Sequence, residues 1–266
     1  MTVADLLSAS KLQRNEAEIL LAALLRKDRT WILAHPEQEV SESHLQRWRT
    51  WEQRRLAHEP IVYITGEKEF YGRPFTVDAR VLVPRPATEG LVGVALAFLA
   101  APSDSIVPTD AGIVAVSRIL KKLPVTTVVD VGTGSGAIAI TLALERPDLT
   151  FVATDISEGA LDVAQRNAER HNVRDRIAFL HGSCLDPILK LGNPFLLVSN
   201  PPYVCSDRRL PRDVVEYEPS NAIFAGPEGL DVIRIIVQQA IEHPACCGIV
   251  MECEEGHVKE IDRLLQ

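Results

Sequence analysis

Short apolar runs alternate with amphipathic stretches through the second half of the chain. Runs rich in valine, isoleucine, leucine and phenylalanine lie near residues 125–131, 150–154, 176–180, 195–199 and 247–252. Apolar residues at helical spacing lie between and after them, near residues 136–145, 158–171, 229–242 and 256–265. Such alternation is typical of a parallel sheet covered by helices. The pattern therefore predicts an α/β fold for this part of the chain.

The chain before residue 60 has a helical pattern instead. We expect Asn15 and Glu18 to form a capping box at the start of one helix, and Ser41 to cap a later one. Tryptophans and arginines share that later helix, and we expect the tryptophans, Trp48 and Trp51, to belong to the core. The arginines are interpreted either as a solvated face or as a contact surface for an acidic partner: Arg47, Arg49, Arg54 and Arg55.

A change of pattern follows the helical region. Residues 70–78 and 81–83 are expected to form two strands around a turn, and Thr88 and Glu89 to open a helix. Residues 101–112 are rich in proline, serine, aspartate and glycine, which predicts a loop or linker. The sequence thus predicts a helical domain at 1–65, a linking β-hairpin at 66–86 and an α/β domain at 87–266.

Composition narrows the class of protein. The chain has 266 residues, of which 46% are hydrophobic and 24% charged, as in ordinary soluble proteins. We find no apolar run of the ~18 residues that a membrane span needs, and the N-terminus lacks the features of a signal peptide. We therefore expect a cytoplasmic protein without a membrane partner.

Cysteine content and charge exclude further classes. The five cysteines are odd in number and form no Cys-x-x-Cys pair, which argues against a disulfide framework or a metal site. The net charge is −8, whereas proteins that grip long nucleic acids usually carry a basic face. Nucleic acid is therefore an unlikely partner by this criterion, although a local basic patch stays compatible with the total.

A glycine-rich turn follows the first of the predicted parallel strands. The turn reads Gly132-Thr133-Gly134-Ser135-Gly136 and precedes a helix, and glycines there allow a ligand to approach the backbone closely. Its spacing, G-x-G-x-G, differs from the G-x-G-x-x-G of dinucleotide sites, so a pyrophosphate is not the obvious ligand. Asp130 just before the turn also disfavours an anion and suits the cationic part of S-adenosylmethionine.

Residues at the ends of the next two strands extend this site. Asp155 ends the second strand, 155 − 130 = 25 residues beyond Asp130, where an acid is placed to bind two ribose hydroxyls. Ser183 and Cys184 follow the third strand, where the adenine of the cofactor is expected. Cys184 is interpreted either as a contact to the ring or as buried filler.

The fourth strand ends in Asn200-Pro201-Pro202-Tyr203, which suits methylation of a planar nitrogen. The lone pair of an amide nitrogen is delocalised, so methylating it requires fixed geometry and acceptors for its two hydrogens. The side-chain oxygen of Asn200 and the carbonyl of Pro201 are the expected acceptors. Pro202 restricts the backbone, and Tyr203 offers a flat face for stacking. The alternative is that this segment is only a turn that ends a strand.

At these residues the chain resembles the release-factor glutamine methyltransferases (PrmC, also called HemK). The resemblance covers nearly the full length and extends to less widely shared motifs, which are Tyr63 to Glu67, Glu69 to Gly72, Val81 to Pro86 with Thr88 and Glu89, Tyr217 to Pro219 with Ala222, and Gly229 to Asp231. It implies a class I S-adenosylmethionine-dependent methyltransferase fold, with a Rossmann-like parallel sheet and a small N-terminal helical domain that helps to hold the substrate.

The resemblance also implies an activity and its residues. The expected reaction is N5-methylation of the glutamine in the Gly-Gly-Gln loop of class 1 peptide-chain release factors, with S-adenosyl-L-homocysteine as the product. The cofactor pocket would be lined by Gly132 to Gly136, Asp155, Cys184 and Asn200, and the glutamine held by Asn200 to Tyr203. Arg85, Pro86 and Glu89 would border the site. We expect a monomer.

The chain departs from the family pattern in three places. Ser183 stands where the family often has an acid, which leaves the contact to the adenine amino group open. Residues 101–124 are longer than the usual linker. The resemblance also implies two more strands after the final helix, so the sequence predicts that C-terminal strands are missing and that the fifth strand, Gly248 to Glu252, is an exposed edge.

Other functions share the same core motifs. One is glutamine methylation of a ribosomal protein, and another is methylation of an exocyclic base amine in DNA or RNA, which needs a flipped-out or single-stranded base. A third is a scaffold or cofactor-binding protein without catalysis. Net charge and the helical N-terminal region favour a protein substrate.

Overall fold

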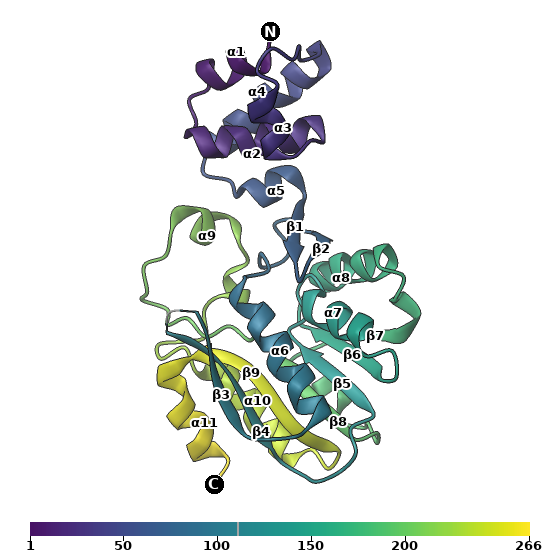
Figure 1. Cartoon of the computed structure of the whole chain (residues 1–266). Helices are drawn as coiled ribbons and strands as arrows, with labels where there is room; N and C mark the ends of the chain where they lie inside the picture. Colours follow the sequence, from purple (N-terminus) through teal and green to yellow (C-terminus); the bar gives the residue numbers. More distant parts are fainter. Residues whose placement is uncertain (111) are drawn as a thin grey trace. The chain divides into compact units, whose positions relative to one another are not determined.

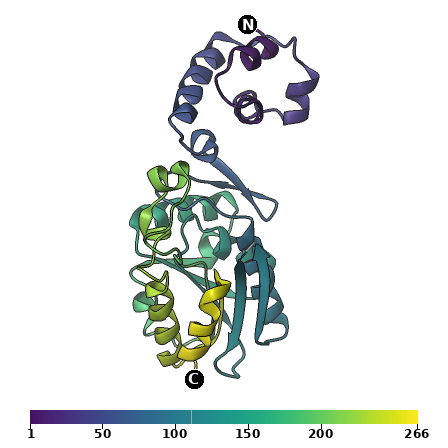
Figure 2. The ribbon, with the colours of Figure 1, turned by 90° about the vertical axis from the view of Figure 1, so that its left-hand side faces the viewer.

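The computed structural model describes residues 1–110 and 112–266 and contains two compact units (Figures 1 and 2). One unit comprises Met1–Glu67 with Leu210–Tyr217, and the other Lys68–Arg209 with Glu218–Gln266. The expected boundary at residue 65 lies close to the first of these divisions. That residues 210–217 pack with the N-terminal helices was not indicated by the sequence.

The first unit is helical, as its pattern indicated. Its helices are α1 (Val3–Ala9), α2 (Arg14–Leu25), α3 (Arg29–Ala34), α4 (Glu42–Leu56), α5 (Ile61–Thr65) and α9 (Arg212–Tyr217). Trp48 is buried in the core of this unit and Trp51 packs against that core, so neither tryptophan forms an exposed platform. The hydroxyl of Tyr217 donates to the carbonyl of Ala57 at 2.7 Å, which ties α9 to the end of α4.

One of the two expected helix caps is present. Ser41 precedes α4, and its hydroxyl accepts from the backbone N–H of His44, which confirms that prediction. The capping box at Asn15 was wrong, because α2 begins at Arg14 and Asn15 lies inside the helix. Glu18 is buried and binds Arg14 at 2.6 Å and Arg29 at 2.8 Å, so its carboxylate does not reach back to the helix start.

The arginines of α4 differ in their surroundings. Arg54 donates to Glu59 at 2.7 Å and Arg55 to Glu16 at 2.7 Å, and both side chains are half-buried within the first unit. Arg47 and Arg49 are exposed. Two of the four arginines therefore hold the helical unit together, and two are open to solvent.

A two-stranded hairpin of β1 (Glu67–Phe70) and β2 (Arg73–Thr76) lies at the start of the second unit, which begins at the second residue of β1, Lys68. The prediction of a hairpin was right, but its second strand was misplaced, since residues 81–83 form no strand. The backbone N–H of Val83 donates to the buried carboxylate of Glu218 at 3.0 Å instead of to a neighbouring strand. A side-chain acceptor from far along the chain therefore replaces the strand partner.

A seven-stranded sheet forms the centre of the second unit, in the order β3-β4-β9-β8-β5-β6-β7. Five strands pair in parallel and confirm the predicted runs, and they are β5 (Thr127–Val131), β6 (Thr150–Asp155), β7 (Ile177–His181), β8 (Phe195–Ser199) and β9 (Cys246–Glu254). The predicted helices are also present, as α6 (Ala87–Ala100), α7 (Ala137–Glu145), α8 (Glu158–Arg170), α10 (Asp231–Glu242) and α11 (Val258–Leu264). Short 3-10 turns lie at Arg174–Arg176, Asp186–Ile188, Ser220–Ala222 and Glu255–His257.

Helices cover both faces of this sheet. Alternate residues of each strand point to opposite faces. Val128 packs in the core formed with α6, α7 and α8, whereas Val129 packs in the core formed with α10 and α11. Strands buried on both faces are expected to be apolar throughout, which explains why the periodic pattern located them correctly.

The far edge of the sheet corrects two predictions. Strands β3 (Ser105–Asp110) and β4 (Ile113–Ile119) form an antiparallel hairpin where the sequence predicted a loop or linker, a prediction that at residue 111 lies outside the described residues. Strand β4 runs antiparallel along β9, from Ile113 opposite Glu254 to Ile119 opposite Gly248. Strand β9 is therefore paired on both sides, and the expectation that the fifth strand is an exposed edge was wrong.

The turn-forming residues of this hairpin explain the misprediction. Pro108 lies on the outer strand, where a missing backbone donor is tolerated, and the strand register shifts between Pro108 and Asp110. Gly112 follows near the tip of the hairpin. Local sequence therefore suggested a loop, whereas pairing with β9, a strand from the far end of the chain, stabilises the extended backbone.

Within residues 1–110 and 112–266, we find no helix long and apolar enough to cross a membrane.

Candidate active site

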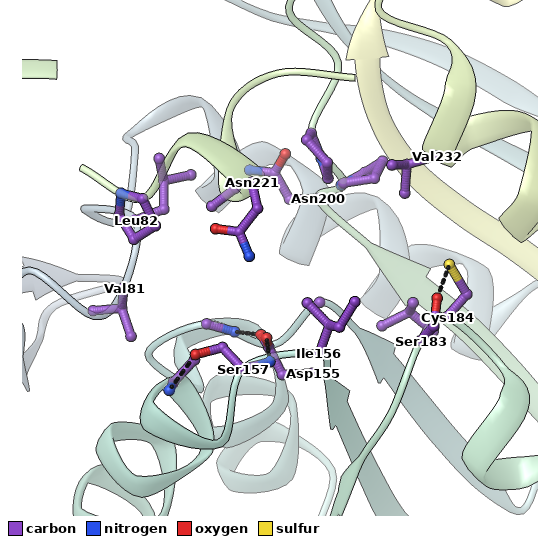
Figure 3. A pocket seen from close by; sticks show the side chains of 18 of the residues that line it. Val81, Leu82, Asp155, Ile156, Ser157, Ser183, Cys184, Asn200, Asn221 and Val232 are labelled. Carbon is purple, nitrogen blue, oxygen red and sulfur yellow. Dashed lines mark hydrogen bonds between the residues drawn. The ribbon is translucent and has the colours of Figure 1, made fainter. Parts of the chain in front are cut away.

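A cavity of about 340 Å³ lies in the second unit beyond the carboxyl ends of the parallel strands (Figure 3). Strand β5 is flanked by β6, which follows it in the chain, and by β8, which follows later. The order of strands reverses between β5 and β8, and ligands of open α/β sheets bind at such a reversal. The topology therefore places the cavity where this class of fold binds its ligands.

Half of the predicted site residues line this cavity, namely Gly132, Gly134, Asp155, Ser183, Cys184, Asn200, Pro201 and Pro202. The others lie outside its lining, namely Asp130, Thr133, Ser135, Gly136, Tyr203, Arg85, Pro86 and Glu89. Most of this second set supports the first through hydrogen bonds or packing. The structure thus separates residues that face a ligand from residues that position them.

The glycine-rich turn exposes backbone to the cavity. Gly132 has a φ of 73° and Gly134 a φ of 54°, which L-residues with side chains rarely adopt. A Cβ atom built on either glycine has no neighbouring atom within 4 Å, so the space beside both is open. The backbone N–H of Gly134 donates to Asp155 Oδ2 at 2.9 Å. The turn is therefore an open cradle fixed to the end of the next strand.

Asp130 stabilises the glycine-rich turn through hydrogen bonds to residues of the turn and of the helix that follows it. Its Oδ2 accepts from the Thr133 hydroxyl at 2.6 Å and from the backbone N–H of Ala139 at 3.1 Å. Burial raises the pKa of Asp130 to about 7, against the opposing effect of these hydrogen bonds. Its Oδ1 is buried without a hydrogen-bond partner among the described residues, which leaves one acceptor of the site unsatisfied.

The back of the turn is held by Asn167, a fully buried residue of α8. Its Nδ2 donates to the carbonyl of Ser135 at 2.8 Å and to that of Thr76 at 2.9 Å, while its Oδ1 accepts from the N–H of Thr76. Gly136 begins α7 and lets Ala164 of α8 approach closely. Ser135 and Gly136 therefore connect the turn to α8 and to the hairpin rather than to the cavity.

The rest of the cavity wall combines one acid with apolar and weakly polar groups. Asp155 Oδ1 accepts from the N–H of Ser157 at 2.9 Å, and burial raises the pKa of Asp155. Ser183 and Cys184 lie at the other side of the cavity (Figure 3), and the Ser183 hydroxyl donates to the Cys184 sulfur at 3.7 Å. Ile156 and Val232 add apolar surface to the cavity wall.

Asn200 directly follows the last residue of β8, and its side-chain amide is fixed by a hydrogen bond to α6. Its Nδ2 donates to the hydroxyl of Thr88, a buried residue in the first turn of α6, at 2.9 Å. The Tyr203 hydroxyl donates to Glu252 Oε1 on β9 at 3.0 Å, outside the cavity lining. Burial, together with the charge of Glu252, raises the pKa of Tyr203. The tetrapeptide is thus anchored at both of its ends.

The remaining predicted residues reinforce the segment before α6. Arg85 forms an ion pair of 2.6 Å with the buried Glu218. Pro86 is the N-cap of α6, and Glu89 in the first turn accepts from the backbone N–H of Tyr71 at 2.9 Å. These residues connect the hairpin, α6 and the segment at Glu218, and they do not reach the cavity lining.

Sequence reasoning missed two polar residues near the tetrapeptide. Asn221 lines the cavity, and Figure 3 shows its side-chain amide pointing into it. Glu252 is fully buried beneath Tyr203. A signal for Glu252 was present, since an acid within the apolar run Ile249 to Cys253 is unusual for a buried strand. Asn221 had no such signal beyond its position two residues after Pro219.

The parallel sheet, its antiparallel edge hairpin and the cavity at the strand reversal define a class I methyltransferase fold. The catalytic domain of hMettl16, solved in complex with the MAT2A 3′UTR hairpin 6, shares this fold with a TM-score of 0.52 at 15% identity. The alignment covers 86% of this chain and 76% of that one. At this identity the likeness concerns the fold alone.

Sequence comparisons identify the family within this class. Residues 2–66 match the PrmC N-terminal domain, and residues 106–216 match the methyltransferase small domain. The release factor glutamine methyltransferase of Neisseria gonorrhoeae is 38% identical over 254 residues, which cover 94% of this chain and 84% of that protein. The chain belongs to the release factor glutamine methyltransferase family.

Longer proteins are also similar to this chain. The bifunctional methyltransferase of Rickettsia bellii is 38% identical over 232 residues, which cover 85% of this chain. The same alignment covers 42% of that protein. The chain therefore spans less than half the length of such relatives.

Proposed function

We propose that this chain transfers a methyl group from S-adenosylmethionine to the side-chain amide nitrogen (N5) of the glutamine in the Gly-Gly-Gln motif of class 1 release factors. The observation that carries this proposal is that Asn200, Pro201 and Pro202 line the same cavity as the glycine-rich turn and Asp155. An acceptor segment suited to a planar amide therefore borders the expected cofactor pocket. The family to which the chain belongs supports glutamine as the acceptor.

The residues around the cavity fit S-adenosylmethionine. When bound, this cofactor supplies a methyl group on a positively charged sulfur. The open space beside Gly132 and Gly134 admits a ligand close to the backbone. Asp155, Ile156 and Val232 line the same cavity, and we propose that Asp155 accepts from the ribose hydroxyls while Ile156 and Val232 contact the flat adenine ring. Asp130 lies outside the cavity lining and would support the cofactor indirectly, by holding the glycine-rich turn through Thr133 and Ala139.

The tetrapeptide accounts for how the acceptor nitrogen is held. The side-chain oxygen of Asn200 and the carbonyl of Pro201 would accept the two hydrogens of the glutamine amide. Two fixed acceptors orient the nitrogen lone pair and favour the pyramidal nitrogen of the transition state over the planar ground state. We further propose that the helical unit, with the exposed Arg47 and Arg49 of α4, contacts the release factor, and that the chain acts as a cytoplasmic monomer.

Asp155→Ala is expected to weaken S-adenosylmethionine binding by about 1–3 kcal/mol, because charged hydrogen bonds to the ribose are lost. The substitution also removes the acceptor that holds the N–H of Gly134. Calorimetric titration measures this change. Asp148→Ala is the matched control, since Asp148 lies near the opposite end of β6 with an exposed side chain. Equal affinities for the wild type and Asp155→Ala would remove Asp155 from the cofactor site.

The activity is tested with labelled S-adenosylmethionine and a class 1 release factor, beside a Gln→Ala variant of its Gly-Gly-Gln motif. Label on the wild-type factor alone is the expected result. Label on both factors would place the methyl group elsewhere on the substrate. No label on either factor, with cofactor binding intact, would reject this substrate and direct the assay to ribosomal proteins and single-stranded nucleic acids.

A further inference from the structure

The orientation of the Asn200 amide is set by groups behind the cavity. A carboxamide ends in an oxygen that accepts and a nitrogen that donates, and the two are nearly equal in size. In the structure Nδ2 donates to Thr88 Oγ1 at 2.9 Å. With the nitrogen turned to Thr88, the oxygen is the terminal atom left for a substrate. The hydroxyl of Thr88 thus decides which end of the amide is available.

The Thr88 hydroxyl accepts from Asn200 only while its own hydrogen points elsewhere. A hydroxyl has one hydrogen to donate, and an ionised carboxylate only accepts. Thr88 is 4% exposed, and its buried neighbour Glu252 is 0% exposed. Burial raises the pKa of Glu252, and hydrogen bonding to Thr88, Tyr203 and Asn200 acts in the opposite direction, with Thr88 contributing most. Glu252 is therefore a buried acceptor available to the hydrogen of the Thr88 hydroxyl.

The second carboxylate oxygen is consistent with this arrangement. Oε1 of Glu252 accepts from the Tyr203 hydroxyl at 3.0 Å. Oε2 is buried and has no hydrogen-bond partner among the described residues. Unused acceptor capacity on a buried carboxylate is costly, so Oε2 is open to a further donor such as the Thr88 hydroxyl.

We propose that Glu252 and Thr88 are positioning residues that fix the Asn200 side chain with its oxygen toward the methyl-accepting amide. This inference rests on the proposed function in naming an amide as the acceptor. The observed hydrogen bond runs from Asn200 to Thr88, and in this arrangement the Thr88 hydroxyl would in turn donate to Glu252. A reversed Asn200 amide would present N–H groups to the N–H groups of the substrate, and one of the two acceptors would be lost.

The protonation of Glu252 governs this direction. Protonated Glu252 can donate to Thr88, which frees the Thr88 hydroxyl to donate to Asn200 and so to reverse the amide. The pKa of Glu252 lies above its usual value, so methyl transfer should fall as pH decreases through that raised pKa. The other ionisable groups facing this carboxylate are Tyr203, Arg85 and Cys253. Glu254, the next acid on β9, is paired with Arg208.

The test compares Thr88→Val, Thr88→Ser and Glu252→Gln in the full chain. Loss of one directing hydrogen bond is expected to lower kcat about tenfold or more in Thr88→Val and in Glu252→Gln, and Thr88→Ser should restore most of the rate. The Kd for S-adenosylmethionine should stay close to that of the wild type. Glu252→Gln should also lose the acidic limb of the pH–rate profile, which a merely structural role would not remove. Thr141→Val is the matched control, because Thr141 is a buried threonine of α7 whose hydroxyl lacks a described partner.

A second measurement is independent of methyl transfer. The side-chain amide protons of Asn200 are identified by NMR from their disappearance in Asn200→Ala, and their exchange with solvent is compared in the wild type and Thr88→Val. Faster exchange in Thr88→Val, but not in Thr141→Val, supports the inference. Unchanged exchange, or an unchanged kcat and pH profile in an active enzyme, would overturn it. A wild type that labels no release factor would instead contradict the proposed function, and the NMR comparison would still decide the orientation.

Discussion

Asn200→Ala is expected to lower kcat for methyl transfer about 100- to 1,000-fold, the size of effect seen when one positioned hydrogen-bonding group is removed from a transition state. The variant loses the side-chain oxygen that would accept a hydrogen of the glutamine amide. Its cavity retains Gly134 and Asp155, so the affinity for S-adenosylmethionine should change little. Rates at saturating cofactor, with calorimetry for the Kd, separate the two effects.

The two ends of β8 provide the control for this substitution. Asn193 is exposed just before the strand, and Asn200 follows its last residue, Ser199. Asn193→Ala is expected to keep the wild-type rate, since it lies at the amino end of the sheet, away from the cavity. A turnover of Asn200→Ala close to that of the wild type would contradict the mechanism. A large loss of cofactor affinity would instead move Asn200 from the acceptor site to the cofactor site.

Gly229→Ala is expected to displace the acceptor tetrapeptide and to destabilise the fold. Gly229 has a φ of 72°, and a Cβ atom there would lie 2.2 Å from the carbonyl oxygen of Tyr203. Because the overlapping atom of Tyr203 belongs to the backbone, no side-chain rotation can relieve the overlap. We expect a loss of about 1–2 kcal/mol from the strained φ and about 1–3 kcal/mol more from overpacking, with a fall in kcat.

The contact at Gly229 matters because the surrounding segments are joined. Val204 donates its N–H to Ile223, and Ser206 donates to Gly226, so the residues after the tetrapeptide pair with the loop before α10. Moving one segment moves the other. Thermal unfolding measures the loss of stability, and steady-state kinetics with a release factor measures the change in rate.

Gly72→Ala separates the effect of backbone strain at positive φ from the effect of a steric overlap with the Tyr203 carbonyl. Gly72 in the turn of the β1–β2 hairpin has a φ of 69°, and a Cβ atom there meets nothing within 4 Å. It should therefore show only the loss of about 1–2 kcal/mol that belongs to the strained backbone. Equal stability losses and equal rates for Gly72→Ala and Gly229→Ala would show that the contact with Tyr203 has no consequence.

Much of the second unit could be predicted because its signals are local. Strands such as Phe195–Ser199 are buried on both faces and are apolar at every position but the last, and the helices between them repeat apolar residues at their own period. The glycine-rich turn follows one strand and Asp155 ends the next, and parallel strands end at the same edge of the sheet. The sequence therefore indicated that Gly134 and Asp155 meet.

Elements whose partners lie far along the chain could not be predicted in this way. The hairpin of β3 and β4 contains Pro108 and Gly112, which indicate a loop locally, and it becomes extended because it pairs with β9. Residues 81–83 contain apolar residues typical of a strand, yet the backbone of Val83 bonds to Glu218. In both segments a distant acceptor or donor outweighs the local preference.

The sequence by itself determined the fold class, the positions of the parallel strands along the chain and the residues Asn200 to Tyr203 that carry the proposed chemistry. Only the tertiary structure decided which residues support them. Asn167 behind the turn, and Thr88 with Glu252 behind Asn200, act through hydrogen bonds between segments separated by many residues. Local patterns reflect the burial of each segment, whereas the direction of a hydrogen bond depends on the partner that folding brings next to it.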